Sequence, residues 1–348
     1  MRSSKALHTE PGMRILIVKL SSLGDVIQTL PVVQDLRAAF PQARIDWAVE
    51  EAFADLLQSV PGLERVLPCA QRRWRKTPFD ARVRSERAAF RARLREEAYD
   101  AVIDGQGLIK SAMVARQARL APGGFTATFG NASELCGYEW PVKWLLQRGV
   151  PMPRQVHAVA RTRLLAAGAL DYAQAHFMAE PPCYPFPPLA PVSQRQGVWL
   201  CHGTTRADNE WPLDHWAELG QRLLAAGERV CIPQASDKEA AWAAQLVARL
   251  GEGAEVLPRL KLSALWPRMA DSRGVVSVDS GLGHLAVALD LPVVQLFSQP
   301  RIRRAGPIGR AHQAAIGGDH VPAIDEAWQA WQRCSQAQAD PTGAACAS

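Results

Sequence analysis

Short apolar runs that alternate with amphipathic helical segments constrain the fold of this chain more than any other feature. In the N-terminal half, Arg14–Lys19, Ile45–Val49 and Ala101–Asp104 have the apolar character of buried strands. Helical patterns near Glu51–Ser59 and Asp80–Glu97 separate these strands. Strands that alternate with helices are typical of β-α-β units wound into one parallel sheet.

The alternation stops at a proline-rich segment and then starts again. Proline propagates neither a helix nor a central strand, so this segment is a predicted linker. At 348 residues the chain is long enough for two cores. After the linker we expect strands at residues 197–201, 229–232, 275–278 and 293–297, and helices at 213–226, 238–250, 284–289 and 323–336. The predicted organisation is therefore an N-terminal α/β domain of residues 13–179, a linker of residues 180–196, a C-terminal α/β domain of residues 197–336, and a disordered tail of residues 337–348.

Composition excludes several classes of protein. Hydrophobic residues make up 48% of the chain, as in globular proteins, and no apolar run approaches the roughly 20 residues that cross a bilayer. The first twelve residues are polar and do not resemble a secretory signal, so we expect a cytoplasmic protein. The seven cysteines are scattered and form no C-x-x-C pair, which argues against a zinc cluster or a disulfide framework.

Positive charge is concentrated in one segment of the chain. The formal net charge is +6, and between residues 72 and 95 only Asp80 and Glu86 oppose a run of basic residues. Such a run indicates a polyanionic partner: nucleic acid, an anionic membrane surface or a phosphorylated acceptor. A solvated helix face is the alternative. The basic residues are Arg72, Arg73, Arg75, Lys76, Arg82, Arg84, Arg87, Arg91, Arg93 and Arg95.

Four loops follow predicted strands and are candidates for ligand binding, because ligands of open parallel sheets bind outside the carboxyl ends of the strands. They are residues 20–24, 105–110, 202–208 and 279–283. In the first loop, Ser21 and Ser22 precede Gly24 and Asp25, where a helix is expected to begin. Asp25 is either a functional carboxylate or a helix cap. The glycine fingerprints of dinucleotide sites and P-loops are absent from the sequence.

Two loops of the C-terminal half have the character of anion sites. In the segment 277–284, Gly281 and the glycine before His284 leave room for a diphosphate at a helix N-terminus, and Asp279 is placed to accept from sugar hydroxyls. The alternative is a capped turn with a packed histidine. In the segment 202–208, hydroxyl groups precede a guanidinium group, which suits phosphate. These residues are Thr204, Thr205 and Arg206.

A fourth candidate lies in the N-terminal half. Lys110 begins a helix after the glycine-containing loop that follows Asp104. Together with the basic residues 72–76, it predicts an anion pocket for an acceptor. A solvated helix residue is the alternative for Lys110.

Six motifs in sequence resemble the heptosyltransferases of lipopolysaccharide core biosynthesis, glycosyltransferase family 9, and among them heptosyltransferase I. The resemblance runs from about residue 13 to residue 298. The motifs are R-I-L-I-V-K-L-S-S-L-G-D-V at 14–26, R-R-W-R-K at 72–76, D-G-Q-G-L-I-K-S-A at 104–112, Q-V-H-A-V-A-R-T-R at 155–163, H-G-T-T-R at 202–206 and S-V-D-S-G-L-G-H-L at 277–285.

The resemblance implies a GT-B fold, in which two Rossmann-like domains with parallel sheets face each other across a cleft. It implies an inverting transferase that uses no metal or other cofactor, with ADP-heptose as donor and Kdo2-lipid A as acceptor. Asp25 matches the catalytic base, and the donor-binding positions match Ser22, Thr204, Thr205, Asp279, Gly281 and His284. The acceptor side would use Arg72, Arg73, Arg75, Lys76 and Lys110. We also expect a monomer that touches the cytoplasmic face of an anionic inner membrane and binds no nucleic acid.

The sequence departs from the family pattern at two places. Asn209 stands where the family usually has a lysine near the diphosphate, and F-S-Q-P-R at 297–301 replaces an aromatic-G-P-T pattern. Arg206 and Arg301 are candidates to supply the missing charge. Heptosyltransferase II is the alternative within the family. The alternative from another class is a nucleic-acid-binding protein, which would need exposed aromatic side chains among Trp74, Phe79 and Phe90.

Overall fold

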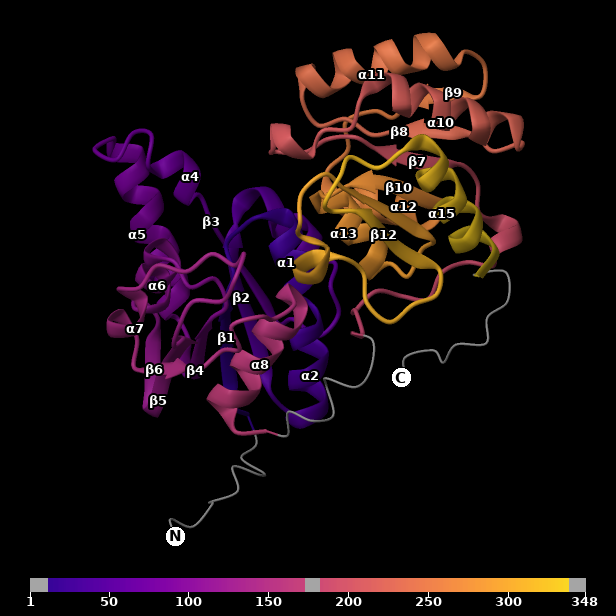
Figure 1. The fold of residues 1–348 in the computed structure, drawn as a ribbon. Coiled ribbons are helices and arrows are strands. Elements are labelled where there is room, and N and C mark those ends of the chain that lie inside the picture. The colour runs from indigo at the N-terminus through magenta and orange to yellow at the C-terminus, as the bar shows by residue number, and fades with distance from the viewer. Residues whose placement is uncertain (1–11, 173–181, 338–348) are drawn as a thin grey trace. The chain divides into compact units, whose positions relative to one another are not determined.

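The computed structural model describes residues 12–172 and 182–337, which form two compact units (Figure 1). Unit 1 comprises Met1–Ser21 and Thr29–Ala179, and unit 2 comprises Ser22–Gln28 and Glu180–Ser348. The segment Ser22–Gln28, predicted within the N-terminal domain, groups with unit 2. The first eleven residues, part of the predicted linker and nearly all of the predicted tail lie outside the described residues.

Unit 1 is built on a six-stranded sheet in which every neighbouring pair is parallel. The strand order is β3-β2-β1-β4-β5-β6. Burial on both faces explains why β1 and β4 were recognisable as near-continuous apolar runs. The strands are β1 (Arg14–Val18), β2 (Arg44–Glu50), β3 (Arg65–Cys69), β4 (Ala98–Asp104), β5 (Arg119–Phe129) and β6 (Arg148–Val150).

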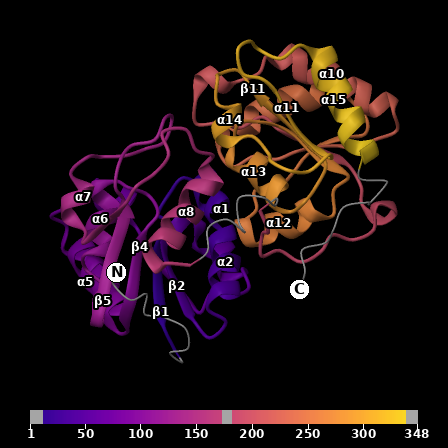
Figure 2. The ribbon, with the colours of Figure 1, turned by 60° about the horizontal axis from the view of Figure 1, so that its bottom comes forward.

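Helices cover both faces of this sheet (Figure 2). On one face α5 (Ala81–Arg95), α6 (Ile109–Ala115) and α7 (Val142–Leu145) share one apolar core with the strands. On the other face α2 (Pro31–Ala39) packs against α8 (Ala158–Leu170), and Arg163 of α8 donates two hydrogen bonds, of 2.7 and 2.8 Å, to Asp35 of α2. Smaller elements are η1 (Glu51–Phe53), α3 (Ala54–Gln58) and α4 (Gln71–Trp74).

Unit 2 repeats this plan with a second all-parallel sheet. Its order is β12-β11-β10-β7-β8-β9, which is the order of unit 1 when the strands of unit 2 are counted along the chain. The strands are β7 (Val198–Cys201), β8 (Val230–Ile232), β9 (Ala254–Val256), β10 (Gly274–Val278), β11 (Val293–Phe297) and β12 (Gln313–Gly317).

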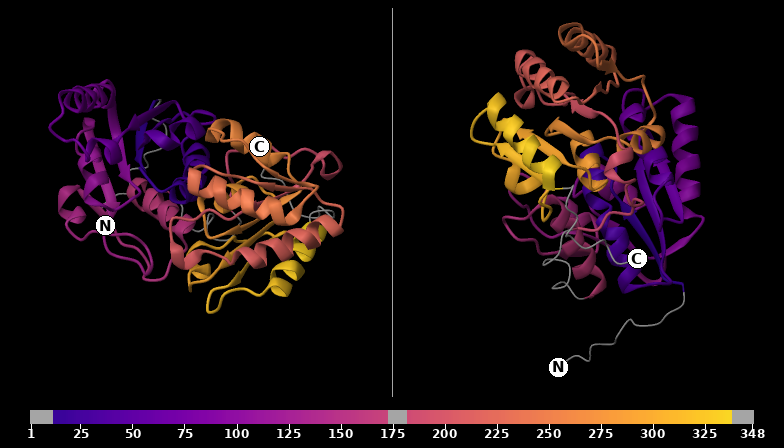
Figure 3. Two further views of the ribbon diagram at one scale, coloured as in Figure 1. Left: turned by 90° about the horizontal axis from the view of Figure 1, so that it is seen from above. Right: turned by 90° about the vertical axis from the view of Figure 1, so that its right-hand side faces the viewer.

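The sheet of unit 2 also lies between two helical layers (Figure 3). On one face α10 (Leu213–Ala225), α11 (Asp237–Leu250) and α15 (Ile324–Ala337) bury their apolar stripes, with Trp216 and Trp331 in the core. The other face carries α12 (Leu262–Ala270) and α13 (Gly281–Ala288). The remaining elements are α1 (Leu23–Thr29), α14 (Ile302–Ala305), η2 (Val192–Gln194) and η3 (Ala207–Asn209).

The shared strand order determines where ligands are expected. In each sheet the order reverses between two central strands, β1 and β4 in unit 1 and β7 and β10 in unit 2. Loops leaving the carboxyl ends of such strands diverge to opposite faces and open a crevice. Three of the four predicted loops begin directly after β4, β7 and β10. The fourth follows β1 and leads into α1.

Two features of the composition have structural counterparts. Five cysteines (69, 136, 201, 231 and 334) are free thiols, as expected, whereas Cys183 is disulfide-bonded, which the sequence did not indicate. Within residues 12–172 and 182–337, no helix is both long and apolar enough to cross a membrane.

Candidate active site

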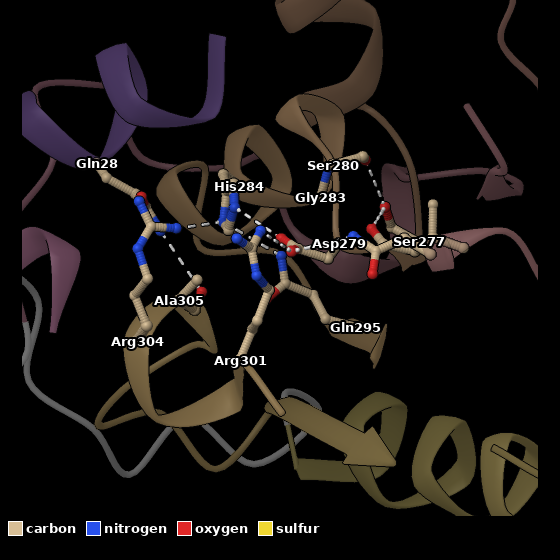
Figure 4. Close-up of polar contacts among 12 residues, drawn as sticks. Gln28, Ser277, Asp279, Ser280, Gly283, His284, Gln295, Arg301, Arg304 and Ala305 are labelled. Atoms are coloured by element: carbon tan, nitrogen blue, oxygen red, sulfur yellow. Dashed lines mark hydrogen bonds and ion pairs between the residues drawn. The ribbon is translucent and has the colours of Figure 1, made fainter. Parts of the chain in front are cut away.

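The loop from β10 to α13 in unit 2 is shaped by a cap and a glycine (Figure 4). Ser280 is the N-cap of α13, and its hydroxyl accepts from the Gly283 N–H at 3.3 Å. A Cβ on Gly283 would lie 2.7 Å from Ser277 Oγ and 2.9 Å from Gln295 Nε2, so these side chains would have to shift to admit any other residue. Because the first N–H groups of a helix have no partner within the helix, this N-terminus suits an anion.

His284 is held on both of its ring nitrogens. The side-chain nitrogens of Gln28 and Gln295 lie 3.5 and 3.4 Å from its Nδ1, and Asp279 Oδ1 lies 3.3 Å from its Nε2 (Figure 4). Because a carboxylate oxygen only accepts, the Nε2–H of His284 donates to Asp279. The Nε2–H of His284, a residue that the family resemblance places among the donor-binding positions, is therefore directed to Asp279 in this structure.

Asp279 connects the two predicted donor loops. Its backbone oxygen accepts from Thr204 Oγ1 at 3.5 Å, and its Oδ2 lies 3.4 Å from Asn209 Nδ2. Burial raises the pKa of Asp279, but the hydrogen bond from His284 and neighbouring guanidinium groups outweigh this effect and hold the pKa below its usual value. Asp279 is consequently an ionised anchor between the loops that follow β7 and β10.

Arginines surround this anchor. Arg301 Nη1 lies 4.0 Å from Asp279 Oδ2, and Arg206 forms a forked ion pair with the neighbouring Asp208. Burial and the charges of Arg206 and Arg304 lower the pKa of Arg301. A lowered pKa means that the surroundings of Arg301 disfavour its positive charge. A bound anion would offset this unfavourable free energy. Thr205 is exposed beside these residues.

Helix α1 brings the predicted base into unit 2. Ser22 donates to Asp25 Oδ2 from its backbone nitrogen, at 3.1 Å, and from its hydroxyl, at 2.9 Å, and Arg304 Nη2 lies 3.3 Å from Asp25 Oδ1. Asp25 is the third residue of α1, and its carboxylate accepts from both donors of Ser22, the residue before the helix. Its side chain is 30% exposed, so the ion pair does not seal it from solvent.

Two glycines allow α1 to lie this close to α13. A Cβ on Gly24 would come within 2.5 Å of the His284 ring, and one on Gly281 would come within 2.7 Å of the Leu23 side chain. The glycine at 281 therefore serves close helix packing in addition to any approach of a ligand.

In unit 1, Lys110 lies where the strand order reverses. Its Nζ donates to Ser21 Oγ at 3.1 Å. The Gln106 side chain accepts from the Leu20 N–H at 2.8 Å and lies 3.4 Å from Ser21 Oγ, so it joins the loops after β1 and β4. Burial raises the pKa of Asp104 to about 6, and its carboxylate accepts from the Gln106 and Gly107 N–H groups.

The acceptor-side basic residues have different environments. Lys110 is half-buried, and burial followed by the charge of Arg72 lowers its pKa, with Arg75 contributing. The Arg72 N–H donates to Glu50 at 2.9 Å, which ties α4 to the end of β2. Arg73 is instead engaged in ion pairs with Glu51 and Glu86. Lys76 is exposed. Arg72, Arg75 and Lys110 thus form one cationic cluster, and Arg73 contributes to the local fold.

Sequence reasoning missed several residues of these sites. Gln28, Gln295 and Arg304 lie far apart in the sequence and reach His284 and Asp25 only through the fold. Gln106 and Glu50 stood at the ends of predicted strands, a position that could have marked them. Among the described residues, no group of three or more histidine, cysteine or acidic side chains is arranged to hold a metal ion.

Two parallel sheets of Rossmann strand order, each with a polar site where the order reverses, define a GT-B α/β protein. The model of glycosyltransferase family 9 (heptosyltransferase) matches residues 87–326. Lipopolysaccharide heptosyltransferase 1 of Pseudomonas aeruginosa is 40% identical over 316 residues, which cover 88% of this chain and 84% of that protein. The chain belongs to glycosyltransferase family 9 and is a glycosyltransferase.

Two further comparisons refine this membership. The structure of E. coli heptosyltransferase WaaC with ADP-2-deoxy-2-fluoro heptose has a TM-score of 0.74 and 36% identity, covering 91% of this chain and 98% of that chain. Lipopolysaccharide heptosyltransferase 2 of Escherichia coli is 25% identical over 298 residues, 82% of each chain. The chain is more similar to the type 1 relative and to WaaC than to the type 2 relative.

Proposed function

We propose that this protein transfers heptose from ADP-heptose to a Kdo residue of Kdo2-lipid A, with inversion at the anomeric carbon and without a metal ion. We also propose that the protein acts as a monomer at the cytoplasmic face of the inner membrane. Similarity to a type 1 heptosyltransferase, and to the heptosyltransferase WaaC solved with ADP-2-deoxy-2-fluoro heptose, supports the choice of substrates.

One observation carries the donor side of this proposal. At the reversal point of unit 2, the N-terminus of α13 and the Thr204 loop meet at Asp279, and Arg301 lies beside them. Backbone N–H groups and guanidinium groups that converge on one point suit the diphosphate of a nucleotide sugar. Because ADP leaves with the electron pair of the broken C–O bond, these groups also stabilise the charge that grows in the transition state.

In the proposed reaction, the Kdo hydroxyl oxygen attacks the anomeric carbon and its proton passes to the Asp25 carboxylate. The ion pair with Arg304 places a positive charge beside this carboxylate. Once Asp25 is neutralised by the proton, the charge of Arg304 no longer has that partner. Arg304 also acts on Asp279 electrostatically, so it is near enough to the diphosphate site to help stabilise the leaving group.

The test is incubation with ADP-heptose and a de-acylated acceptor that carries two Kdo sugars, followed by mass analysis. The proposal expects addition of one heptose, and Asp25→Asn, which keeps the shape of the side chain, should lower product formation by about 10² to 10⁴. An unchanged acceptor mass with folded wild-type protein would refute the proposed function. A parallel acceptor that already carries one heptose distinguishes the type 2 activity, which would modify only that molecule.

The nucleic-acid alternative has little support from the basic segment. Trp74 and Phe90 are buried against each other, with ring centroids 5.8 Å apart, so neither side chain is free to stack on a base. Phe79 alone among the three aromatic residues of this segment is exposed.

A further inference from the structure

Large apolar side chains are exposed mainly in one part of the molecule. Eight such side chains are exposed among the described residues, and only Ile308 and Val321 belong to unit 2. The other six belong to unit 1: Phe79, Ile109, Met113, Leu135, Trp140 and Trp144. Exposed apolar groups that gather in one region indicate an interaction surface, whereas scattered ones need no explanation.

Two tryptophans of this group contact each other at α7. Trp140 is 62% exposed and Trp144 is 69% exposed, and their rings meet edge to face with centroids 4.8 Å apart. Lys143 Nζ lies 5.3 Å from the centroid of the Trp144 ring. An amphipathic aromatic pair beside an ammonium group is the combination that side chains at a membrane–water interface show.

The tryptophans adjoin the exposed apolar residues of α6. Glu139, which precedes Trp140, accepts from the Ile109 N–H at 2.6 Å, and its own N–H donates to the Gly107 oxygen at 2.9 Å. Helices α6 and α7 pack against each other over the same core. Ile109, Met113, Trp140, Lys143 and Trp144 therefore belong to one region, which we call the α6–α7 surface.

Positive charge adjoins this surface. Lys110 follows Ile109, and its pKa is lowered in part by Arg72 and Arg75, so these three cations are close together. On the same face of the sheet, Arg91 of α5 donates to Gln117 just beyond α6, at 3.2 Å. Helix α5 buries only Val83, Phe90 and Leu94, and its exposed arginines are Arg82, Arg84, Arg91, Arg93 and Arg95.

We propose that the α6–α7 surface docks on an anionic lipid bilayer, with Trp140 and Trp144 in the headgroup region and the neighbouring basic side chains on lipid phosphates. This assignment deepens the proposed function, because a lipid acceptor would then leave the bilayer beside Lys110. Docking itself requires no donor, no acceptor and no turnover.

Two arguments favour a bilayer over a second copy of the chain. Protein–protein interfaces are depleted in lysine, whereas Lys143 lies over the ring of Trp144 within this surface. A second copy would also bring the same arginine-rich helix against itself, but anionic lipids complement that charge.

The experiment is flotation of the full chain with vesicles of phosphatidylglycerol and phosphatidylethanolamine that contain no Kdo2-lipid A. Wild-type protein should bind these vesicles and should not bind vesicles of phosphatidylcholine. The double variant Trp140→Ser/Trp144→Ser should lose about tenfold or more in partitioning, since each tryptophan contributes a large apolar area. Val321→Ser, which removes an exposed apolar side chain from unit 2, is the matched control and should bind like the wild type.

Each outcome decides the proposal. Equal partitioning of wild type and double variant would overturn it, and so would a wild type that floats with neither vesicle or equally with both. A double variant that converts a dimer to a monomer in light scattering would assign the surface to a second copy instead. Turnover with the de-acylated acceptor should be unchanged in the double variant, so failure of the proposed function and failure of docking are seen in different assays.

Discussion

Arg301 offers a direct test of the diphosphate site. Its guanidinium group lies 4.0 Å from Asp279 Oδ2, and its side chain is 22% exposed. Arg301→Gln removes the charge and keeps most of the length of the side chain. We expect the variant to bind ADP more weakly than the wild type. Burial and the charges of Arg206 and Arg304 disfavour the charge of Arg301, and a bound diphosphate would compensate for this.

The magnitude follows from Coulomb's law. At an effective dielectric constant of about 20, two unit charges about 4 Å apart interact with about 4 kcal/mol. Asp279 already uses part of this attraction, so we assign about half of it, about 2 kcal/mol, to a bound diphosphate. Because each 1.4 kcal/mol corresponds to about a tenfold change, the Kd for ADP should rise about 30-fold.

The assay is isothermal titration of ADP into each variant at two salt concentrations. Arg303→Gln, an exposed arginine two residues away on α14, is the control and should change the Kd by less than about threefold. The Arg301 variant should also show a weaker dependence on salt than the wild type. A Kd within about twofold of the wild type would show that Arg301 does not contact the diphosphate, and the electrostatic reasoning would fail.

A second variant checks the same reasoning from the opposite side. Asn209 Nδ2 and Arg301 Nη1 approach the same oxygen of Asp279, and the family resemblance implies a lysine at position 209. If the two positions supply one charge in alternative ways, Asn209→Lys should restore most of the affinity lost in Arg301→Gln. Lack of rescue in a folded double variant would mean that the two positions act on different parts of the ligand.

Three further predictions concern the base, pH and packing. Asp25→Asn should lower turnover by about 10² to 10⁴ and leave the Kd for ADP within about threefold, by kinetics and titration; near-normal turnover would exclude Asp25 as the base. Asp104 has a folded pKa of about 6, above its unfolded value of 3.8, so the free energy of unfolding should fall as pH rises from about 4 to 6, by about 3 kcal/mol. In urea unfolding, Asp104→Asn should lack this component, and an identical pH dependence in both proteins would contradict it. Gly283→Ala should destabilise unit 2 by about 1–3 kcal/mol in thermal unfolding because its Cβ would meet Ser277 Oγ at 2.7 Å, whereas Gly137→Ala, with its nearest atom at 3.8 Å, should be neutral; equal melting temperatures would contradict the packing argument.

The fold could be predicted where local patterns were strong. Apolar runs such as Arg14–Lys19 and Val293–Phe297 coincide closely with β1 and β11, because strands covered on both faces are apolar throughout. The strand β5 was missed, since Pro122, Gly123 and Gly124 interrupt its apolar character. The pairing of β4 with β5 shifts register at this place, between Tyr99 and Ala101. Such an irregularity depends on the neighbouring strand and leaves no periodic signal.

The candidate site could be predicted only for residues in short motifs. Asp279 and His284 lie five residues apart on one strand–helix turn, so the sequence of this turn was enough to indicate both residues. The ion pair of Asp25 with Arg304 spans 279 positions and has no local signature. Assignment of Ser22–Gln28 to unit 2 was equally hidden, because it depends on contacts made after folding and not on the strand that precedes the helix.

The repeated strand order has a consequence for how specificity is distributed along the chain. A transferase must recognise two unlike molecules, and this chain contains the same ligand-binding topology twice, in separate halves of its sequence. Under the proposed function, substitutions in the loops after β2 and β4 would change the recipient sugar while the loops after β7 and β10 go on binding the same activated sugar. An enzyme with this organisation can acquire a new acceptor while its donor site stays unchanged.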